Sequence, residues 1–146
     1  MRNLLFILVL IALSSSGCVF DQDDHKLVLC NHSMDTSYFY ALTDTTLTMK
    51  YVTFLPRTPY LTVTPGDSGY PLFARKGENW PYKINTICQD SLLRLFIFDA
   101  DTTRKYGWEN IIKLKKYFRF DLSVKELDSL HWHVTYTGLR KKTSEL

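Results

Sequence analysis

Short runs of residues that alternate between apolar and polar side chains recur along this 146-residue chain from residue 26 onward, with turn-forming residues between them. Successive side chains of a β-strand point to opposite faces, so such runs predict half-buried strands. Residues 92–98 are apolar almost throughout, which predicts a strand buried on both faces. The other expected strands cover residues 26–30, 37–43, 47–53, 60–64, 116–122 and 132–136.

Helices are expected only as short segments in the C-terminal third. Residues 108–113 could form one helix. A second is predicted over residues 123–130, where Ser123 and Glu126 form a capping box. Residues 77–81 are expected to be a loop. Roughly seven strands with one or two short helices predict a mostly β protein, an antiparallel, immunoglobulin-like β-sandwich.

The N-terminus has the layout of an export signal. Arg2 is followed by apolar residues 4–13 and then by the small residues 14–17. A membrane-spanning helix needs about 20 apolar residues, so this run is too short to be one. The next residue, Cys18, resembles the modified cysteine of a bacterial lipoprotein lipobox, although Ser15 stands where that motif usually has Leu.

The resemblance implies that Cys18 takes a diacylglycerol and becomes the N-terminus once residues 1–17 are removed. The alternative is ordinary cleavage near Gly17, which would leave Cys18 free. The acidic run that follows is similar to the surface-export signal of Bacteroidota-type lipoproteins, and that similarity implies an outer-membrane lipoprotein at the cell surface. Its residues are Asp21, Gln22, Asp23 and Asp24. A solvated tether is the other interpretation of this run.

The mature part of the chain is expected to form one domain. Removal of residues 1–17 leaves 129 of the 146 residues, a size that suits a single core. We expect a lipidated, acidic tether over residues 18–25, the β-sandwich over residues 26–137 and a polar basic tail over residues 138–146. The remaining net charge near +2 predicts no nucleic-acid partner. A cluster of basic residues is interpreted as a solvated face; it comprises Lys113, Lys115, Lys116 and Arg119.

Two cysteines besides Cys18 could form a disulfide. A bridge between Cys30 and Cys88 would close a loop of nearly 60 residues and contribute about 4 kcal/mol in the chain-entropy model. The alternative is two buried thiols in separate strands, since cysteine is among the most buried residue types.

The segment over residues 96–102 carries two resemblances. An apolar strand that ends in Asp99, Asp101 and Thr102 resembles the first motif of haloacid-dehalogenase-like phosphatases. That resemblance implies a nucleophilic Asp99, proton transfer by Asp101 and a Mg²⁺ ion between them. The family places this motif near the start of a doubly wound α/β domain, whereas only 45 residues follow Asp101 here. In the alternative, structural interpretation, Asp99 and Asp101 form the turn after the strand by accepting hydrogen bonds from backbone amides. Asp101 or Thr102 could then also cap the next helical turn.

About residues 92–137 are also similar to a family of small, uncharacterised Bacteroidota-type lipoproteins. The shared features are the apolar strand with its aspartates, the Asp121-Leu122-Ser123 segment and the aromatic strand over residues 132–136. This resemblance implies a single β-rich lipoprotein domain and no activity or cofactor.

The histidines allow a test for zinc. Cys30 and His32 are two residues apart, as are His131 and His133, so in a strand the two side chains of each pair would share one face. If the two strands were neighbours, these four side chains could meet around a zinc ion. The apolar residues at alternate positions instead favour a last strand whose histidines face solvent; they are Trp132, Val134 and Tyr136. No metal site is therefore predicted.

Two features point to sugars. Trp80, in its expected loop, is the aromatic residue best placed to stack on a glycan. Thr45, in Asp44-Thr45-Thr46, is the best match to the three-residue O-glycosylation motif of Bacteroidota envelope proteins. We therefore expect a lipid-anchored binding or structural module of the envelope, not an enzyme, whose protein or glycan partner is undefined. The alternatives are a phosphatase that uses Asp99 and Asp101 and a sugar-binding accessory module.

Overall fold

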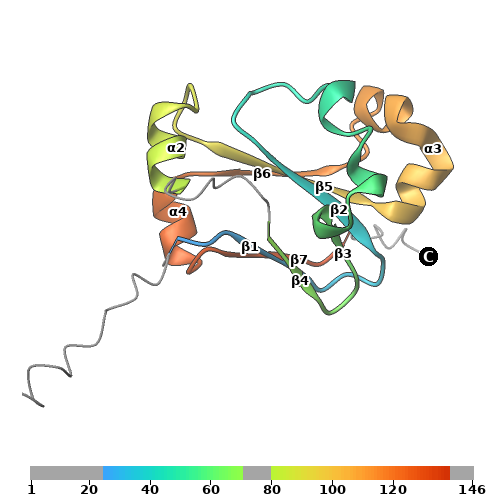
Figure 1. Ribbon diagram of the computed structural model, residues 1–146, viewed down its shortest axis with the longest axis horizontal. Helices are drawn as coiled ribbons and strands as arrows, with labels where there is room; N and C mark the ends of the chain where they lie inside the picture. The colour runs from blue at the N-terminus through green and yellow to red at the C-terminus, as the bar shows by residue number, and fades with distance from the viewer. Residues whose placement is uncertain (1–24, 71–79, 139–146) are drawn as a thin grey trace, which may run out of the picture.

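The structure is a computed structural model that describes residues 25–70 and 80–138. Cys18, the acidic run and residues 139–146 lie outside the described residues, so the expectations for them stay predictions. Within these described residues, seven strands form two sheets, flanked by helices at both ends of the molecule (Figure 1). The chain is thus β-rich, as expected.

The three-stranded sheet contains the first and the last strand of the described chain. Its order is β4 (Ser68–Gly69), β1 (Val28–Asn31) and β7 (His133–Tyr136). Strand β1 pairs antiparallel with β4 but parallel with β7, where Leu29 lies opposite Val134. The first and last strands are therefore side by side (Figure 1).

The four-stranded sheet is antiparallel throughout. Its order is β3 (Thr62–Val63), β2 (Ser37–Leu42), β5 (Leu93–Asp99) and β6 (Phe118–Leu122). Every residue of the inner strand β5 is buried, which confirms the predicted strand with two buried faces.

The helices correct the expectation of a mostly β protein, because the chain is mixed α/β. Over residues 25–70 and 80–138, the α-helices are α2 (Trp80–Thr86), α3 (Ala100–Lys113) and α4 (Val124–Ser129). The same residues form three 3-10 helices, which are η1 (Met49–Tyr51), η2 (Leu55–Arg57) and η3 (Pro59–Leu61). Most of these precede the C-terminal third, where only one or two short helices were expected. Helices α2 and α4 lie at one end of the molecule and α3 at the other (Figure 1).

The predicted strand over residues 47–53 is wrong, because this segment contains η1. Val52 is fully buried, whereas Met49, which the alternation places on the same face as Leu47, is 40 % exposed. Leu47, Val52 and Leu55 supply the buried contacts instead. Their spacing suits tight helical turns better than it suits an extended strand.

Helix α4 confirms the predicted capping box. The backbone amide of Glu126 donates to Ser123 Oγ at 3.3 Å, and the Ser123 amide donates to Glu126 Oε2 at 2.8 Å. Helix α3 begins earlier than expected and is interrupted at Gly107, whose φ of 72° and ψ of 157° are not helical. The predicted helix over residues 108–113 is thus the second half of α3.

Both α3 and α4 end in a Schellman motif that lacks the usual glycine. After α3, the Lys116 amide donates to Ile111 O at 2.9 Å and the Lys115 amide to Ile112 O at 3.2 Å. Lys115 has a φ of 51°, in the left-handed region. His131, with a φ of 48°, occupies the equivalent position after α4. A side chain with a Cβ at such a position costs about 1–2 kcal/mol.

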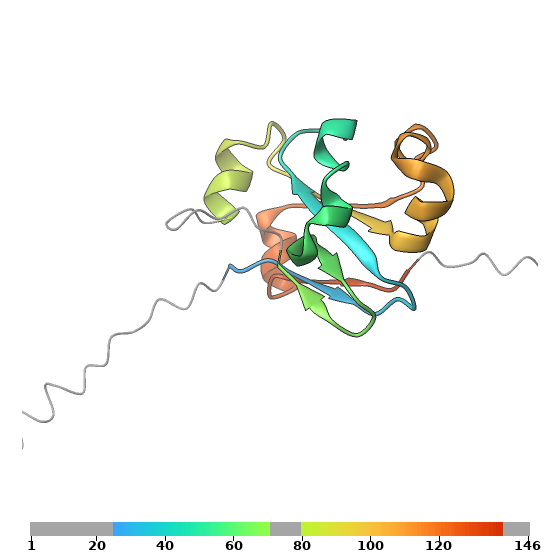
Figure 2. The ribbon, with the colours of Figure 1, turned by 45° about the vertical axis from the view of Figure 1, so that its right-hand side comes forward.

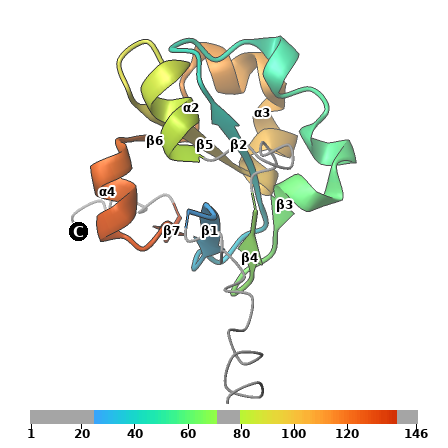
Figure 3. The same ribbon diagram turned by 60° about the vertical axis from the view of Figure 1, so that its left-hand side comes forward.

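Side chains of the two sheets share one core. Figure 2 shows that the two sheets lie close to each other. Phe118 of β6 and Tyr136 of β7 meet edge to face, with ring centroids 5.0 Å apart. Gly69 of β4 lies so close to the other sheet that a Cβ there would overlap the side chains of Val63 and Phe39. The lack of a side chain at Gly69 therefore lets the sheets approach each other, as seen along the molecule in Figure 3.

Candidate functional site

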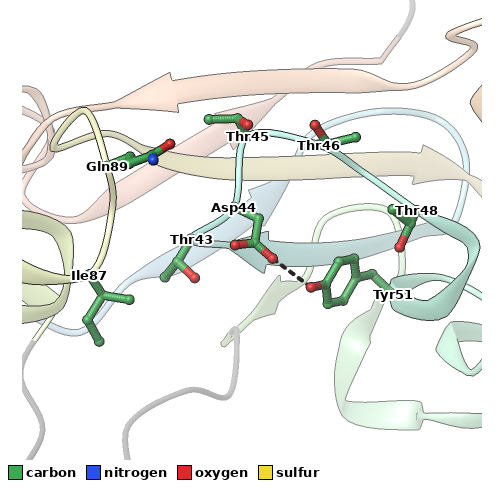
Figure 4. A pocket seen from close by; sticks show the side chains of 8 residues that line it. All are labelled: Thr43, Asp44, Thr45, Thr46, Thr48, Tyr51, Ile87 and Gln89. Atoms are coloured by element: carbon green, nitrogen blue, oxygen red, sulfur yellow. Dashed lines mark hydrogen bonds between the residues drawn. The ribbon is translucent and has the colours of Figure 1, made fainter.

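A surface pocket with a volume of about 520 Å³ lies between the loop that follows β2 and the turn that precedes β5 (Figure 4). Most of its lining side chains carry hydroxyl, carboxyl or amide groups. We name it the threonine pocket; its residues are Thr43, Asp44, Thr45, Thr46, Thr48, Tyr51, Ile87 and Gln89. Its volume falls in the range of small-molecule sites, about 300–1,000 Å³.

A short hydrogen bond organises the threonine pocket. The Tyr51 hydroxyl donates to Asp44 Oδ2 at 2.6 Å, and the two side chains point toward each other across the pocket (Figure 4). This hydrogen bond is the main reason that the pKa of Tyr51 is raised above 10.0. The ring of Tyr40 stacks on that of Tyr51, with centroids 5.9 Å apart. Asp44 keeps its other carboxylate oxygen for a ligand.

Thr45 lies in this pocket, exposed and in a loop, as the glycosylation motif requires. Its glycosylation stays a prediction. The sequence did not indicate the pocket itself, because Tyr51 and Gln89 line it together with Thr45 but come from separate segments of the fold. The clustered threonines of residues 43–48 were the only local signal.

The expectation for Trp80 is wrong. Trp80 is the first residue of α2, not part of a loop, and it is only 6 % exposed within the core. A ring buried in this way has no open face on which a sugar could stack. The most exposed large aromatic side chains of the described residues are tyrosines, among them Tyr60 and Tyr82.

Asp99 and Asp101 have different surroundings. Asp99, at the end of β5, is 8 % exposed and accepts a hydrogen bond from the Tyr136 hydroxyl at 2.6 Å. Burial is the main cause that raises the pKa of Asp99 above 3.8. Asp101 is exposed and pairs with Arg104 at 2.9 Å. The predicted cap is wrong, because Asp99 is the N-cap residue of α3 and its side chain makes no capping bond.

The strand that ends in Asp99 is antiparallel to both of its neighbours, β2 and β6. The phosphatase resemblance implies a parallel, doubly wound sheet instead. Since Tyr136 also binds the Asp99 carboxylate, the arrangement of this segment resembles a buried structural contact more than a nucleophile facing a metal.

The two cysteines are free thiols in the structure, so the bridge that their even number allowed is not formed. Cys30 is half-buried on β1, and Cys88 is buried in the turn after α2. Neither thiol fully matches the alternative of buried thiols in separate strands, because Cys30 is in a strand but only half-buried, and Cys88 is buried but outside any strand. Burial is the main cause that raises the pKa of Cys88 above 9.0.

The zinc hypothesis required neighbouring strands, and β1 and β7 are indeed neighbours. Their side chains, however, follow the predicted alternation: Trp132, Val134 and Tyr136 enter the core. His131 and His133 are exposed, as is His32. Over residues 25–70 and 80–138, no three His, Cys, Asp or Glu side chains come together in a way that could hold a metal.

Comparison with protein-family models, with curated proteins and with solved structures finds no match to this chain. None of the helices in the described part of the chain is both long and apolar enough to cross a bilayer.

Proposed function

We propose that this protein is a lipid-anchored lipoprotein of the outer membrane, displayed at the cell surface, whose domain binds a sugar in the threonine pocket. The anchor rests on the sequence: an export signal ends at Gly17 and is followed at once by Cys18. The acidic residues 21–24 support display at the surface. Similarity over about residues 92–137 to small Bacteroidota-type lipoproteins supports the same location.

The lining of the threonine pocket carries the proposal of sugar binding. Sugars present hydroxyl groups that both donate and accept hydrogen bonds, and threonine hydroxyls do the same. Asp44 can accept from a sugar hydroxyl, while the Gln89 amide can donate to one. Tyr51 holds the Asp44 carboxylate in place before a ligand arrives. The proposal thus keeps a sugar-binding role but moves it away from the buried Trp80.

The scaffold is proposed to be a divergent β-sandwich. Support comes from side chains of two sheets that share one core, with the Phe118 and Tyr136 rings in contact between them. Neither the buried Asp99 nor the antiparallel β5 favours the phosphatase alternative, so we do not propose enzymatic activity.

Glycan-array binding by the detergent-solubilised, full-length protein tests the proposal. We expect binding to a subset of neutral glycans, and a loss of about tenfold in affinity for Asp44→Asn, because one charge-assisted hydrogen bond is removed. Asp67→Asn is the matched control. Asp67 also accepts a hydrogen bond from a loop hydroxyl, that of Thr64, but lies outside the threonine pocket.

Two results would overturn sugar binding at this site: no bound glycan on the array, or equal affinities for the wild type and Asp44→Asn. Equal weakening by Asp67→Asn would also contradict it, since a general effect of losing a loop carboxylate would then explain the result.

A further inference from the structure

A second pocket, with a volume of about 580 Å³, lies where the chain leaves the C-terminal end of α3. We name it the α3 pocket. Its lining carries three lysines and one aspartate, a net charge of two positive units at neutral pH. The lining residues are Asp101, Thr102, Lys105, Tyr106, Leu114, Lys115 and Lys116.

The positive charge of the α3 pocket is available to a ligand. In the described segments, no carboxylate pairs with Lys105, Lys115 or Lys116. The one acidic residue, Asp101, is neutralised by Arg104 at 2.9 Å. Ammonium groups without a carboxylate partner favour an anion that brings several acceptor oxygens at once.

Tyr106 holds two of the lysines together. The Lys116 ammonium lies 4.4 Å from the centroid of the Tyr106 ring, and the Lys105 ammonium lies 5.3 Å from it. The negative face of the ring offsets part of the repulsion between the two cations. The two ammonium groups are therefore already held close together before any anion enters the pocket.

Lys115 contributes its ammonium group from a strained backbone position. It occupies the left-handed C′ position of a Schellman motif, where glycine is the usual residue. A lysine there strains the backbone, as His131 does after α4. A lysine at the helix end also suits the helix dipole, but the neighbouring Lys113 and Lys116 do so without strain.

We propose that the α3 pocket binds the phosphate group of a phosphorylated sugar. In this proposal the phosphate lies among the ammonium groups of Lys105, Lys115 and Lys116. The sugar hydroxyls face the hydroxyl groups of Thr102 and Tyr106. The volume is larger than a bare phosphate needs and suits a small ligand that carries one. Lys115 and Lys116, two members of the basic cluster interpreted as a solvated face, are part of a binding site in this proposal.

The position of the pocket favours a sugar phosphate over a lipid headgroup. The described chain begins beside α4, where His25 contacts Trp132 at a centroid distance of 5.1 Å. Helix α3 is at the other end of the long axis (Figure 1). A domain tethered through its N-terminus thus presents this pocket away from its own membrane. This choice of source, unlike the phosphate site, rests on the proposed lipid anchor.

Calorimetric titration of the detergent-solubilised protein with glucose 6-phosphate and with glucose tests the proposal at constant ionic strength. We expect at least tenfold tighter binding of the phosphorylated sugar. Lys115→Gly should weaken glucose 6-phosphate binding about tenfold and yet raise the Tm by roughly 3–6 °C, because it removes the ammonium and the strain together. Asp44→Asn should leave that affinity unchanged, which separates this site from the threonine pocket.

His131→Gly is the matched control, since it relieves the same strain after α4 without touching the α3 pocket. It should raise the Tm without changing the affinity. Equal affinities of the wild type for the two sugars, or an affinity unchanged in Lys115→Gly, would overturn the phosphate site. Binding to phosphatidylglycerol vesicles with no response to glucose 6-phosphate would overturn the choice of a sugar.

Discussion

One buried carboxylate links the two sheets of this domain. Asp99, at the end of β5, accepts a hydrogen bond from Tyr136 of β7. Next to it in the β2–β5 register is Ser37, whose hydroxyl has no hydrogen-bond partner among the described residues. A polar contact of this kind fixes how the sheets meet, although removing a charge from water has a cost.

This carboxylate predicts a dependence of stability on pH. The folded protein holds the Asp99 proton more tightly than the unfolded chain, because its folded pKa is raised above 3.8. Its contribution to stability is therefore fully present below pH 3.8 and is lost as the pH rises through the folded pKa. Asp99→Asn, which can still accept from Tyr136, should flatten this loss and be at least as stable as the wild type at about pH 7. Urea unfolding from acidic to neutral pH measures both effects.

Tyr136→Phe is the control for that experiment. It removes the hydrogen bond to Asp99 but keeps the ring, so it should lower the free energy of unfolding at neutral pH by about 1.5–3 kcal/mol. A less stable Asp99→Asn protein at neutral pH, with the wild-type slope retained, would show that Asp99 is not a buried titrating group.

At the scale of elements, α3 depends on the backbone of Gly107. The φ of 72° and ψ of 157° at this residue belong to a region that is open almost only to glycine. A Cβ added at this residue would meet no atom within 4 Å, so backbone strain alone opposes a larger residue. Gly107→Ala should therefore lower the free energy of unfolding by about 1–3 kcal/mol, measured by urea denaturation.

Because Gly107 lies within α3, the Gly107→Ala variant tests whether the helix is interrupted at this residue. A change below about 0.5 kcal/mol would mean that α3 can run straight through residue 107, against the interrupted helix described above. Gly66→Ala, another glycine of positive φ with no close neighbours but in a turn, provides the comparison.

Local signals determined which elements could be predicted. The capping box of α4 and the apolar run of β5 each depend only on residues that are close in sequence, and both predictions are confirmed. Residues 47–53 carry an alternation that suits a strand, yet tertiary burial of Val52 and Leu55 selects helical turns. Pro81 favours a loop around Trp80 when the sequence is taken alone, whereas proline is also well tolerated in the first turn of a helix.

The two pockets could not be predicted, for a different reason. Each joins segments that the fold brings together, such as Thr45 with Gln89 and Asp101 with Lys116. The spacing of residues in the sequence predicts a contact only when both residues belong to the same helix or strand. The basic residues near α3 were visible in the sequence, but the cation–π contacts to Tyr106 were not.

At the scale of the whole molecule, the proposed anchor predicts where the protein is found. Stable attachment needs more than one acyl chain, which Cys18 would provide after lipidation. Cys18→Ser should therefore release the domain into the soluble fraction or leave the signal uncleaved. Membrane fractionation with immunoblotting measures both. Unchanged fractionation together with normal processing would contradict the lipoprotein assignment.

Replacement of Asp21, Asp23 and Asp24 by alanine is the companion experiment. This variant should keep its membrane fractionation and lose protease accessibility on intact cells. Equal accessibility would leave the acidic run as a tether.

The pairing of β1 with β7 has a consequence for the time at which this domain can fold. Strand β1 is completed only by β4 and by β7, the last strand of the described chain. Contacts between such distant segments form late, since the intervening loop must close first. An emerging polypeptide thus cannot finish its three-stranded sheet until about residue 136 has been synthesised. The export proposed above requires an unfolded chain, and the late closure of this sheet favours that state while the chain is being synthesised.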